Sequence, residues 1–373
     1  MEFTAKRLDE LKEKLTRKML YAVKCAKEVD GIPYSVENGK WTFGEKDWWT
    51  NGFWAAEMWQ MYLMSGNGTF REEAVRAEEF MDDALRDTPA LHHDVGFMWL
   101  IQSGVRYALE GNKDSYDRTY LAANILAGRY NPNGFIRAWN GDRYGWAIID
   151  TMMNLNLLYW ASRVTKDPRY KLIAMKHADT AMKYFVREDG SCNHIVIFDP
   201  ETGAFLDNPA GQGIASGSSW SRGQAWALHG FALAYRSTGK KEYLETSRKV
   251  ADYFLSQIEK DAVPKCDFRQ PADEPLYDDA AGGIAASGLI ELAEHLPEGE
   301  KERYMDAALR ILDAMDTRDA DYGEASPAIL TKCTCAYHHK DHHIAMNYGD
   351  YFYIEALHKL MGNRMNFWAP DVK

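Results

Sequence analysis

The sequence predicts an all-α fold, an (α/α)6 barrel in which six inner helices are surrounded by six outer ones. Two observations lead to this prediction. Helical segments of two kinds, apolar and amphipathic, alternate along the 373 residues, and the alternation typical of strands is brief, near 193–198. A helix that is apolar on nearly every side must be buried on most sides, whereas an amphipathic helix covers a core with one face. Six of each in alternation make a closed double ring, so we expect residues 1–373 to form one domain.

The predicted inner helices are apolar nearly all round. They cover residues 51–62, 95–109, 148–162, 221–236, 280–294 and 347–361. Each begins at residues of types that cap helices, namely Thr50 or Asn51, Asp94, Asp150, Ser219 or Ser221, Asp278 or Asp279, and Asn347. Inner helices of such a barrel run parallel, so their N-termini share one mouth. The peptide dipoles give this mouth a positive field that suits an anionic ligand.

The predicted outer helices are amphipathic. In 69–87 and 298–316, apolar residues recur every three or four positions among charged ones. The other four outer helices are expected near 3–28, 113–129, 168–187 and 240–259. The longest insertion, about 188–219, is rich in Gly, Pro, Asn and Ser, and we interpret it as a functional loop.

Composition excludes several classes of protein. A net charge of -11 argues against a nucleic-acid partner, because binding to phosphates needs clustered Lys and Arg. No stretch has the uninterrupted apolar length that spans a bilayer, so no membrane partner is expected, and the charged N-terminus does not resemble a signal peptide. Five scattered cysteines are an odd number and do not suggest a disulfide framework. We therefore expect a cytoplasmic protein.

Asp94 and Asp150 stand at matching places, at the starts of two successive inner helices, and should meet at the mouth. Two neighbouring carboxylates cannot both ionise cheaply, so the pKa of one is raised and that acid can donate a proton. The alternative is that both residues only cap their helices.

Tryptophan is concentrated in the first half of the chain, with nine of the twelve between residues 41 and 160. Aromatic faces suit carbohydrate binding because the C–H groups of a sugar ring pack on them. The tryptophans in loops or at helix starts are expected to line the mouth: Trp41, Trp48, Trp49, Trp139, Trp146 and Trp220. Those in mid-helix are expected in the core: Trp54, Trp59, Trp99 and Trp160.

The segment "GQGIASGSSWSRGQAW", residues 211–226, joins small residues to the start of an inner helix. Trp220, Arg222, Gln224 and Trp226 gather in the first turns of that helix. Arg222 is a candidate clamp for a substrate carboxylate, and the alternative is a surface arginine after a glycine-rich loop.

The segment "KCTCAYHHKDHH", residues 332–343, is dense in possible zinc ligands: Cys333, Cys335, His338, His339, His342 and His343. Its spacing matches no standard zinc motif, so incidental metal affinity is favoured over a true site and no metal centre is expected. The chain also lacks H-E-x-x-H, a phosphate-binding loop and G-x-S-x-G.

These residues together resemble the unsaturated glucuronyl hydrolases, glycoside hydrolase family 88. The resemblance covers essentially the whole chain, and its most specific block is "SSWSRGQAW". It rests on "HHDVGFMW", "AIIDTMMNLNLLYWAS", "SGSSWSRGQAWALHGFALAYRSTG", "DDAAGGIAASGLIEL" and "GDYFYIEAL".

The resemblance implies an (α/α)6 barrel, no cofactor, and an oligosaccharide substrate whose non-reducing uronic acid has a C4=C5 double bond. It implies hydration of this vinyl ether, with Asp150 as general acid and base. Asp94 would hold ring hydroxyls and help to raise the pKa of Asp150. The residues implied to line the sugar subsite are His93, Trp139, His194, Gln212, Trp220, Arg222 and Trp226.

Three alternatives stay open at this point. They are an unsaturated rhamnogalacturonyl hydrolase on the same barrel, a sugar epimerase, and a non-catalytic barrel that binds carbohydrate or zinc. The sequence also departs from familiar family members before "NYGDYF", where its Cys/His segment replaces Ser-rich or Lys-bearing ones. This departure leaves the preference for the leaving sugar open.

Overall fold

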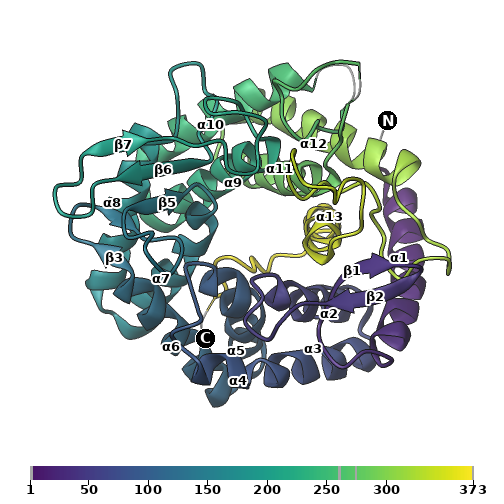
Figure 1. Ribbon diagram of the computed structural model, residues 1–373. Coiled ribbons are helices and arrows are strands. Elements are labelled where there is room, and N and C mark those ends of the chain that lie inside the picture. The colour runs from purple at the N-terminus through teal and green to yellow at the C-terminus, as the bar shows by residue number, and fades with distance from the viewer. Residues whose placement is uncertain (1–2, 259–261, 274, 372–373) are drawn as a thin grey trace.

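The computed structural model describes residues 3–258, 262–273 and 275–371 as a double ring of helices (Figure 1). The inner ring consists of α2 (Asn51–Ser65), η1 (Gly96–Gly104) continued by α5 (Val105–Glu110), α7 (Thr151–Thr165), α9 (Ser221–Thr238), α11 (Asp279–Ala293) and α13 (Asn347–Leu360). The outer ring consists of α1 (Ala5–Ala26), α3 (Gly68–Phe80) with α4 (Asp82–Arg86), α6 (Lys113–Gly128), α8 (Pro168–Tyr184), α10 (Lys241–Gln257) and α12 (Glu298–Arg318).

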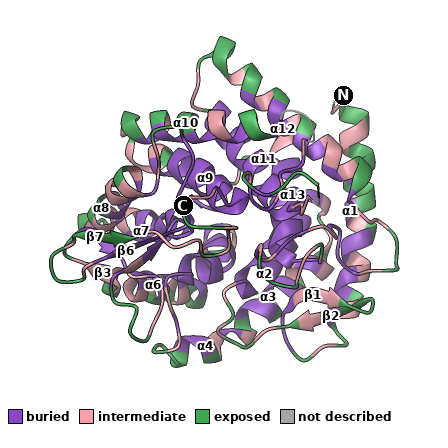
Figure 2. Ribbon diagram, turned by 45° about the horizontal axis from the view of Figure 1, so that its top comes forward, coloured by how far each residue is buried: buried purple, intermediate pink, exposed green. Residues whose placement is uncertain are grey.

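The inner ring is closed by contacts between neighbours. Going round it, α2 packs on η1, η1 on α7, α7 on α9, α9 on α11, α11 on α13, and α13 again on α2. Every residue of α11 is buried, whereas α12 buries only one stripe of its surface. Figure 2 shows this contrast between the inner and outer helices throughout the molecule. The (α/α)6 barrel is thus confirmed; residue 259, the predicted end of one outer helix, lies outside the described residues.

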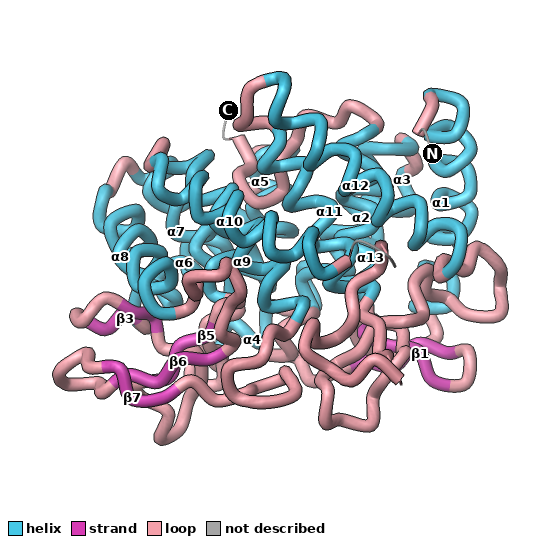
Figure 3. Tube along the Cα trace, turned by 90° about the horizontal axis from the view of Figure 1, so that it is seen from above, coloured by secondary structure: helices cyan, strands magenta, loops and turns pink. Residues whose placement is uncertain are grey.

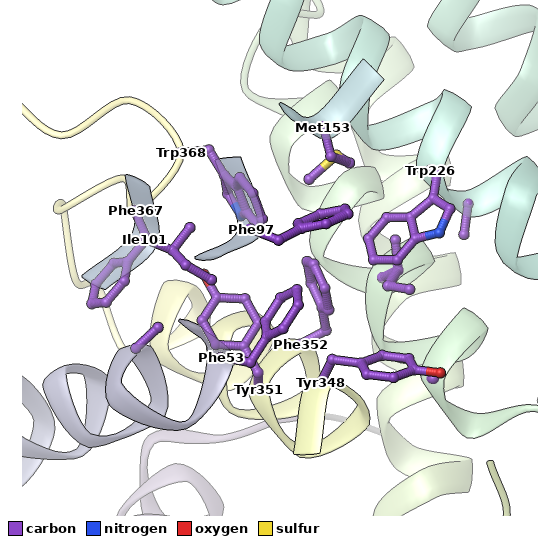
Figure 4. Packing of buried hydrophobic residues seen from close by; sticks show 14 of the residues in the cluster. Phe53, Phe97, Ile101, Met153, Trp226, Tyr348, Tyr351, Phe352, Phe367 and Trp368 are labelled. Carbon is purple, nitrogen blue, oxygen red and sulfur yellow. The ribbon is translucent and has the colours of Figure 1, made fainter. Parts of the chain in front are cut away.

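Aromatic side chains fill the centre of the inner ring (Figure 4). Phe97 contacts Trp226 at a ring-centroid distance of 5.1 Å, and Phe352 stacks on Trp368 at 5.8 Å. Trp368 comes from the segment after the last helix and was not expected in the core. The four tryptophans expected there, Trp54, Trp59, Trp99 and Trp160, are fully buried, which confirms that expectation.

The inner helix predicted over 95–109 starts as a π-helix rather than an α-helix. Its Phe97 N–H donates to the side-chain oxygen of Asn154 on α7, at 2.9 Å. Gly96 lies against the same side chain, so that a Cβ at this position would come within 2.6 Å of Asn154 Oδ1. This close approach of η1 to α7 occurs beside the acid pair described below, and π-helical turns are frequent at functional sites.

The expected capping of the inner helices is wrong in its detail. Thr50, Asp150 and Asp278 stand at N-cap positions, but their side chains make no capping hydrogen bond. The N-caps of η1, α9 and α13 are Val95, Trp220 and Met346, one residue away from the expected ones in each case. Side-chain caps are found instead on four outer helices, at Thr4, Asn67, Asn112 and Asp167. The polar side chains at the inner N-termini instead contact residues of other helices and loops, as described below for Asp94, Asp150 and Asp278.

Short strands and long loops gather at one end of the barrel (Figure 3). The strand expected near 193–198 is confirmed as β6 (Ile195–Phe198). It pairs with β7 (Phe205–Asp207), which also lies within the predicted loop, and with β5 (Trp146–Ile148), which precedes α7. Two hairpins were not predicted because their strands are too short for a pattern: β1 (Pro33–Glu37) with β2 (Lys40–Phe43), and β3 (Tyr130–Asn131) with β4 (Phe135–Ile136). None of the described helices has the length and apolarity needed to cross a bilayer.

The approach of α2 to η1 yields a test of the inner ring. A Cβ on Gly52 would lie 2.1 Å from the Phe97 carbonyl oxygen, and backbone cannot move aside as a flexible side chain can. We expect Gly52→Ala to lower the free energy of unfolding by at least about 3 kcal/mol, measured by urea denaturation. Gly68→Ala on α3, where a Cβ meets nothing within 4 Å, is the control and should change it by less than about 1 kcal/mol. Equal effects of the two substitutions would contradict this packing.

Candidate active site

A cavity of about 350 Å³ opens where the inner helices begin. Its walls come from loops that are far apart in the sequence but meet at the same end of the barrel. The lining residues are Tyr34, Trp48, Trp49, His92, His93, Asp94, Trp139, Ile148, Asp150, Gln212, Cys335, Ala336, His339 and Tyr348. The two predicted acids therefore do meet at one mouth.

Asp150 lies between the end of β5 and the start of α7. The pairing of β5 with β6 fixes this point, because the next residue after β5, Ile149, donates its N–H to the His194 carbonyl oxygen at 3.0 Å. Asp150 is only 9% exposed, and among the described residues its Oδ1 has no hydrogen-bond partner. The atom facing it is Nε2 of His194, at 3.6 Å.

Burial raises the pKa of Asp150 to about 8, and the negative charge of Asp94 acts in the same direction. Arg222 and the indole N–H of Trp226 lower the pKa by a smaller amount. At neutral pH the carboxyl group of Asp150 is consequently protonated in most molecules. This is the state that the sequence predicted for one acid of the pair.

Asp94 is the ionised member of the pair. Its Oδ1 accepts from the amide of Asn154 at 3.2 Å, and its Oδ2 lies 3.2 Å from Nδ1 of His92 and 3.3 Å from Nε2 of His93. Burial alone would raise the pKa of Asp94, but His93, His92 and Asn154 together bring it below its usual value. Asn154 also donates to the Asp150 carbonyl oxygen at 3.3 Å, so the first turn of α7 contacts both acids.

His93 and His194 are both neutral, because burial lowers the pKa of each imidazole to about 3. His194 Nδ1 accepts from the Gln212 backbone N–H at 2.9 Å. A neutral imidazole has one protonated nitrogen, so the proton of His194 is on Nε2 and faces Asp150. His93 Nδ1 lies 3.0 Å from the hydroxyl of Thr151, the first residue of α7.

Aromatic rings form much of the cavity wall. Trp139 packs edge-on against His93 and Trp146, with centroid distances of 6.3 and 6.0 Å. Trp48 and Trp49 precede α2 and also line the cavity, as expected. Trp41 does not: it is 5% exposed, packs on Trp54 and donates its N–H to the Ala22 carbonyl oxygen. Its alternation within β2 turns this side chain toward α1 and away from the mouth.

The remaining predicted aromatic residues, Trp146, Trp220 and Trp226, are not among the residues that line the cavity. Trp220 packs on the His194 ring at a centroid distance of 4.2 Å and supports it from the α9 side. Trp226 is completely buried one turn further on, within the central aromatic cluster (Figure 4). It was expected to line the sugar subsite, but its side chain belongs to the central aromatic cluster and not to the cavity lining.

Residues 24–267 match the model of Glycosyl Hydrolase Family 88. The chain belongs to this family. The unsaturated glucuronyl hydrolase of Bacillus sp. strain GL1 is 35% identical over 354 residues, which cover 91% of this chain and 93% of that protein. An unsaturated chondroitin disaccharide hydrolase of Streptococcus pyogenes is 32% identical over 330 residues, 86% of this chain and 83% of that protein.

Solved structures of family members have the same fold as this glycosidase. The crystal structure of the Bacillus sp. GL1 enzyme, described as responsible for the degradation of glycosaminoglycan, superposes with a TM-score of 0.90 at 30% identity, covering 96% of this chain and 98% of that one. An unsaturated glucuronyl hydrolase from Streptococcus agalactiae superposes with a TM-score of 0.91 at 28% identity, covering 98% and 94%.

Arg222 is not placed as the expected clamp for a substrate carboxylate. Its guanidinium is 1% exposed and donates to the carboxylate of Asp278 and to the carbonyl oxygens of Thr334 and Cys335. Asp278 in turn accepts from the Thr334 N–H at 3.2 Å. The clamp prediction is corrected accordingly: Arg222 binds an internal carboxylate and fixes the 332–343 loop against α9 and α11.

The Cys/His segment forms this loop rather than a cluster of ligands. Cys333 is buried and pairs through its backbone with Ile344, whereas the His338 ring contacts the Ile214 carbonyl oxygen. His342 contacts other backbone oxygens of its own loop, and His343 accepts from the Tyr277 N–H. Only Cys335 and His339 of the six reach the cavity wall, where Gln212 also donates to the Cys335 carbonyl oxygen at 2.6 Å.

Several functional residues were missed. Asn154 could have been found, because it follows Asp150 by four positions and therefore shares its helix face. Tyr34 and Tyr348 could not, since only the closed ring brings β1 and the start of α13 together with the acid pair. Asp278 was seen only as a cap, and no pattern connected it with Arg222.

The buried Arg222–Asp278 pair yields a prediction for stability. Replacing one partner leaves the other charge buried without compensation, so Asp278→Asn should lower the free energy of unfolding by about 3 to 5 kcal/mol. The double variant Arg222→Met/Asp278→Asn has no unpaired charge and should recover part of this loss. Urea denaturation of both variants measures these free energies of unfolding. If the double variant is less stable than Asp278→Asn by as much as the Arg222→Met substitution costs alone, the two residues are not coupled and the pairing is contradicted.

Proposed function

We propose that this family 88 glycosidase removes a 4,5-unsaturated glucuronic acid from the non-reducing end of an oligosaccharide by hydrating its vinyl ether. The observation that carries the proposal is the acid pair, in which Asp150 is protonated and Asp94 ionised at neutral pH. An aromatic cavity of about 350 Å³ surrounds the pair and suits one sugar ring with part of its neighbour.

The reaction begins with transfer of the Asp150 proton to C4 of the double bond. Positive charge then develops on C5 and the ring oxygen, and a water molecule adds to C5 while giving a proton to the Asp150 carboxylate. The resulting hemiketal opens to a ketone and leaves a hemiacetal at C1, whose collapse releases the neighbouring sugar. Asp150 recovers its proton within the cycle, so the proposed reaction needs no cofactor.

The surroundings of Asp150 support both of its roles. Its raised pKa makes the carboxyl group a proton donor at neutral pH, and a pKa near the working pH lets the same group accept a proton in the second step. His194 Nε2–H faces the carboxylate that forms in between. The negative charge of Asp94 stabilises the cationic sugar, and its remaining lone pairs can accept hydrogen bonds from ring hydroxyls.

The uronate carboxylate is received by neutral groups in this proposal. None of the described residues that line the cavity is Lys or Arg, and the buried guanidinium of Arg222 already donates to Asp278 and to the carbonyl oxygens of Thr334 and Cys335. Neutral donors among the lining residues include Gln212, Tyr34 and Tyr348, and the N-terminal turns of the inner helices add backbone N–H groups. We assign the whole chain to one catalytic domain, and place it in the cytoplasm because all five cysteines, each within the described part of the chain, are free thiols.

The central test replaces the acid. Asp150→Asn keeps the size of the side chain but cannot give or take the proton, so we expect the rate to fall by at least about 10²- to 10⁴-fold. The assay follows loss of the ultraviolet absorbance of the double bond with chondroitin-, hyaluronan-, heparin-, gellan- and rhamnogalacturonan-derived disaccharides. Asp142→Asn, which changes an exposed acid outside the cavity lining, is the matched control and should retain activity. Full activity of Asp150→Asn would refute the assignment.

The pH dependence tests the acid pair. Loss of the Asp150 proton should make kcat/KM fall as the pH rises through about 8. Asp94→Asn removes a charge that raises the pKa of Asp150, so this alkaline limb should move to lower pH. An alkaline limb that moves to higher pH in Asp94→Asn, or does not move at all, would contradict this electrostatic account.

A further inference from the structure

We propose that His92, His93 and Asp94 form a binding site for a zinc ion, which enters the cavity in competition with the sugar. One donor atom from each residue lies within 4.8 Å of the other two. The sequence suggested metal ligands only in residues 332–343, where the structure disperses the side chains. The consecutive trio at the start of η1 brings its donor atoms together instead.

The spacing of the donor atoms fits a tetrahedral zinc site. Asp94 Oδ2 lies 3.2 Å from His92 Nδ1 and 3.3 Å from His93 Nε2. With zinc–ligand bonds of about 2.0 to 2.1 Å, neighbouring donor atoms are about 3.3 to 3.4 Å apart. Charge-assisted hydrogen bonds between such groups are shorter, about 2.7 to 2.9 Å. These two distances are thus closer to the edges of a coordination tetrahedron than to strong hydrogen bonds, and the donor atoms of the two histidines lie within 4.8 Å of each other.

A second layer of contacts orients two of the three ligands. The Thr151 hydroxyl lies 3.0 Å from His93 Nδ1, which leaves Nε2 for the ion. The Asn154 amide donates to Asp94 Oδ1, which leaves Oδ2. Asn154 is itself fixed, because its oxygen accepts from the Phe97 N–H at 2.9 Å. Partners of this kind select the tautomer of a ligating histidine and hold a ligating carboxylate in place.

The site is accessible and incomplete on one side. His92 has a side chain that is 25% exposed, while His93 and Asp94 are buried in the cavity wall. All three residues line the same cavity, so an ion can enter from solvent and keep a water molecule as its fourth ligand. Three protein ligands with an open position are typical of exchangeable or catalytic zinc rather than of structural zinc.

Zinc binding has a direct consequence for the reaction. The ion would occupy the Asp94 carboxylate that the proposed function assigns to the ring hydroxyls and to the cationic sugar. Zinc and substrate would therefore exclude each other. This competition rests on the proposed function, whereas binding of the metal does not.

Calorimetric titration of the full chain with zinc chloride tests the site without any substrate. We expect one ion per chain, with affinity at least about tenfold weaker in His92→Gln. His339→Gln is the matched control, because His339 stands on the same cavity wall with a 66% exposed side chain outside the trio. Asp94→Asn is the second variant should His92→Gln fail to fold, as judged by circular dichroism. Unchanged affinity in these trio variants, or its loss in His339→Gln, would overturn the site.

Cobalt substitution and kinetics complete the test. Cobalt at the site should give the intense visible absorption of tetrahedral coordination, and an octahedral spectrum would contradict the geometry. With an unsaturated disaccharide, zinc should raise KM and leave kcat unchanged, and a fall in kcat alone would overturn the competition. The calorimetric and spectroscopic results stand even if no disaccharide is hydrolysed, so failure of the metal site and failure of the proposed function are distinguishable.

Discussion

The carboxyl group of Asp150 is buried where α7 begins. The negative charge of Asp94 raises the pKa of this group by more than the positive charge of Arg222 lowers it. Burial beside a negative charge raises the free energy of the ionised form, which keeps an acid protonated at neutral pH. The rest of the site is arranged around this state. His92, His93 and Asn154 keep Asp94 ionised, and His194 presents an N–H to the carboxylate that proton transfer creates.

The barrel provides this burial through contacts that lie outside the cavity. The β5–β6 pairing fixes Asp150 and His194 side by side, and Trp220 supports the imidazole from α9. Arg222 neutralises Asp278 and fixes the loop that closes one wall, which explains why this arginine is buried. Within the described part of the chain, no lysine or arginine lines the cavity itself. Beneath them, the buried rings of the central aromatic cluster form the floor of the mouth.

Regular patterns in the sequence were sufficient for the ring of helices and for the meeting of Asp94 with Asp150, because helical periodicity depends on local residues. The role expected for Arg222 was wrong for a physical reason: a guanidinium binds whichever carboxylate the fold supplies, and Asp278 is 56 positions away. Whether Trp41 faces the cavity depends on the direction of the short strand β2, and whether Trp226 does depends on its position along α9. Neither could be predicted from the sequence pattern. Tyr34 and Tyr348 reach the cavity only through ring closure, which leaves no local signal.

The most direct test of this account is the ionisation of Asp150 itself. A pH titration of its carboxyl carbon by ¹³C NMR, assigned with Asp150→Asn, measures that pKa in the free enzyme without reference to any substrate. The account predicts a midpoint of about 8, and a lower one when Asp94 is replaced by asparagine. A midpoint near the ordinary value of about 3.9 in both proteins would contradict it.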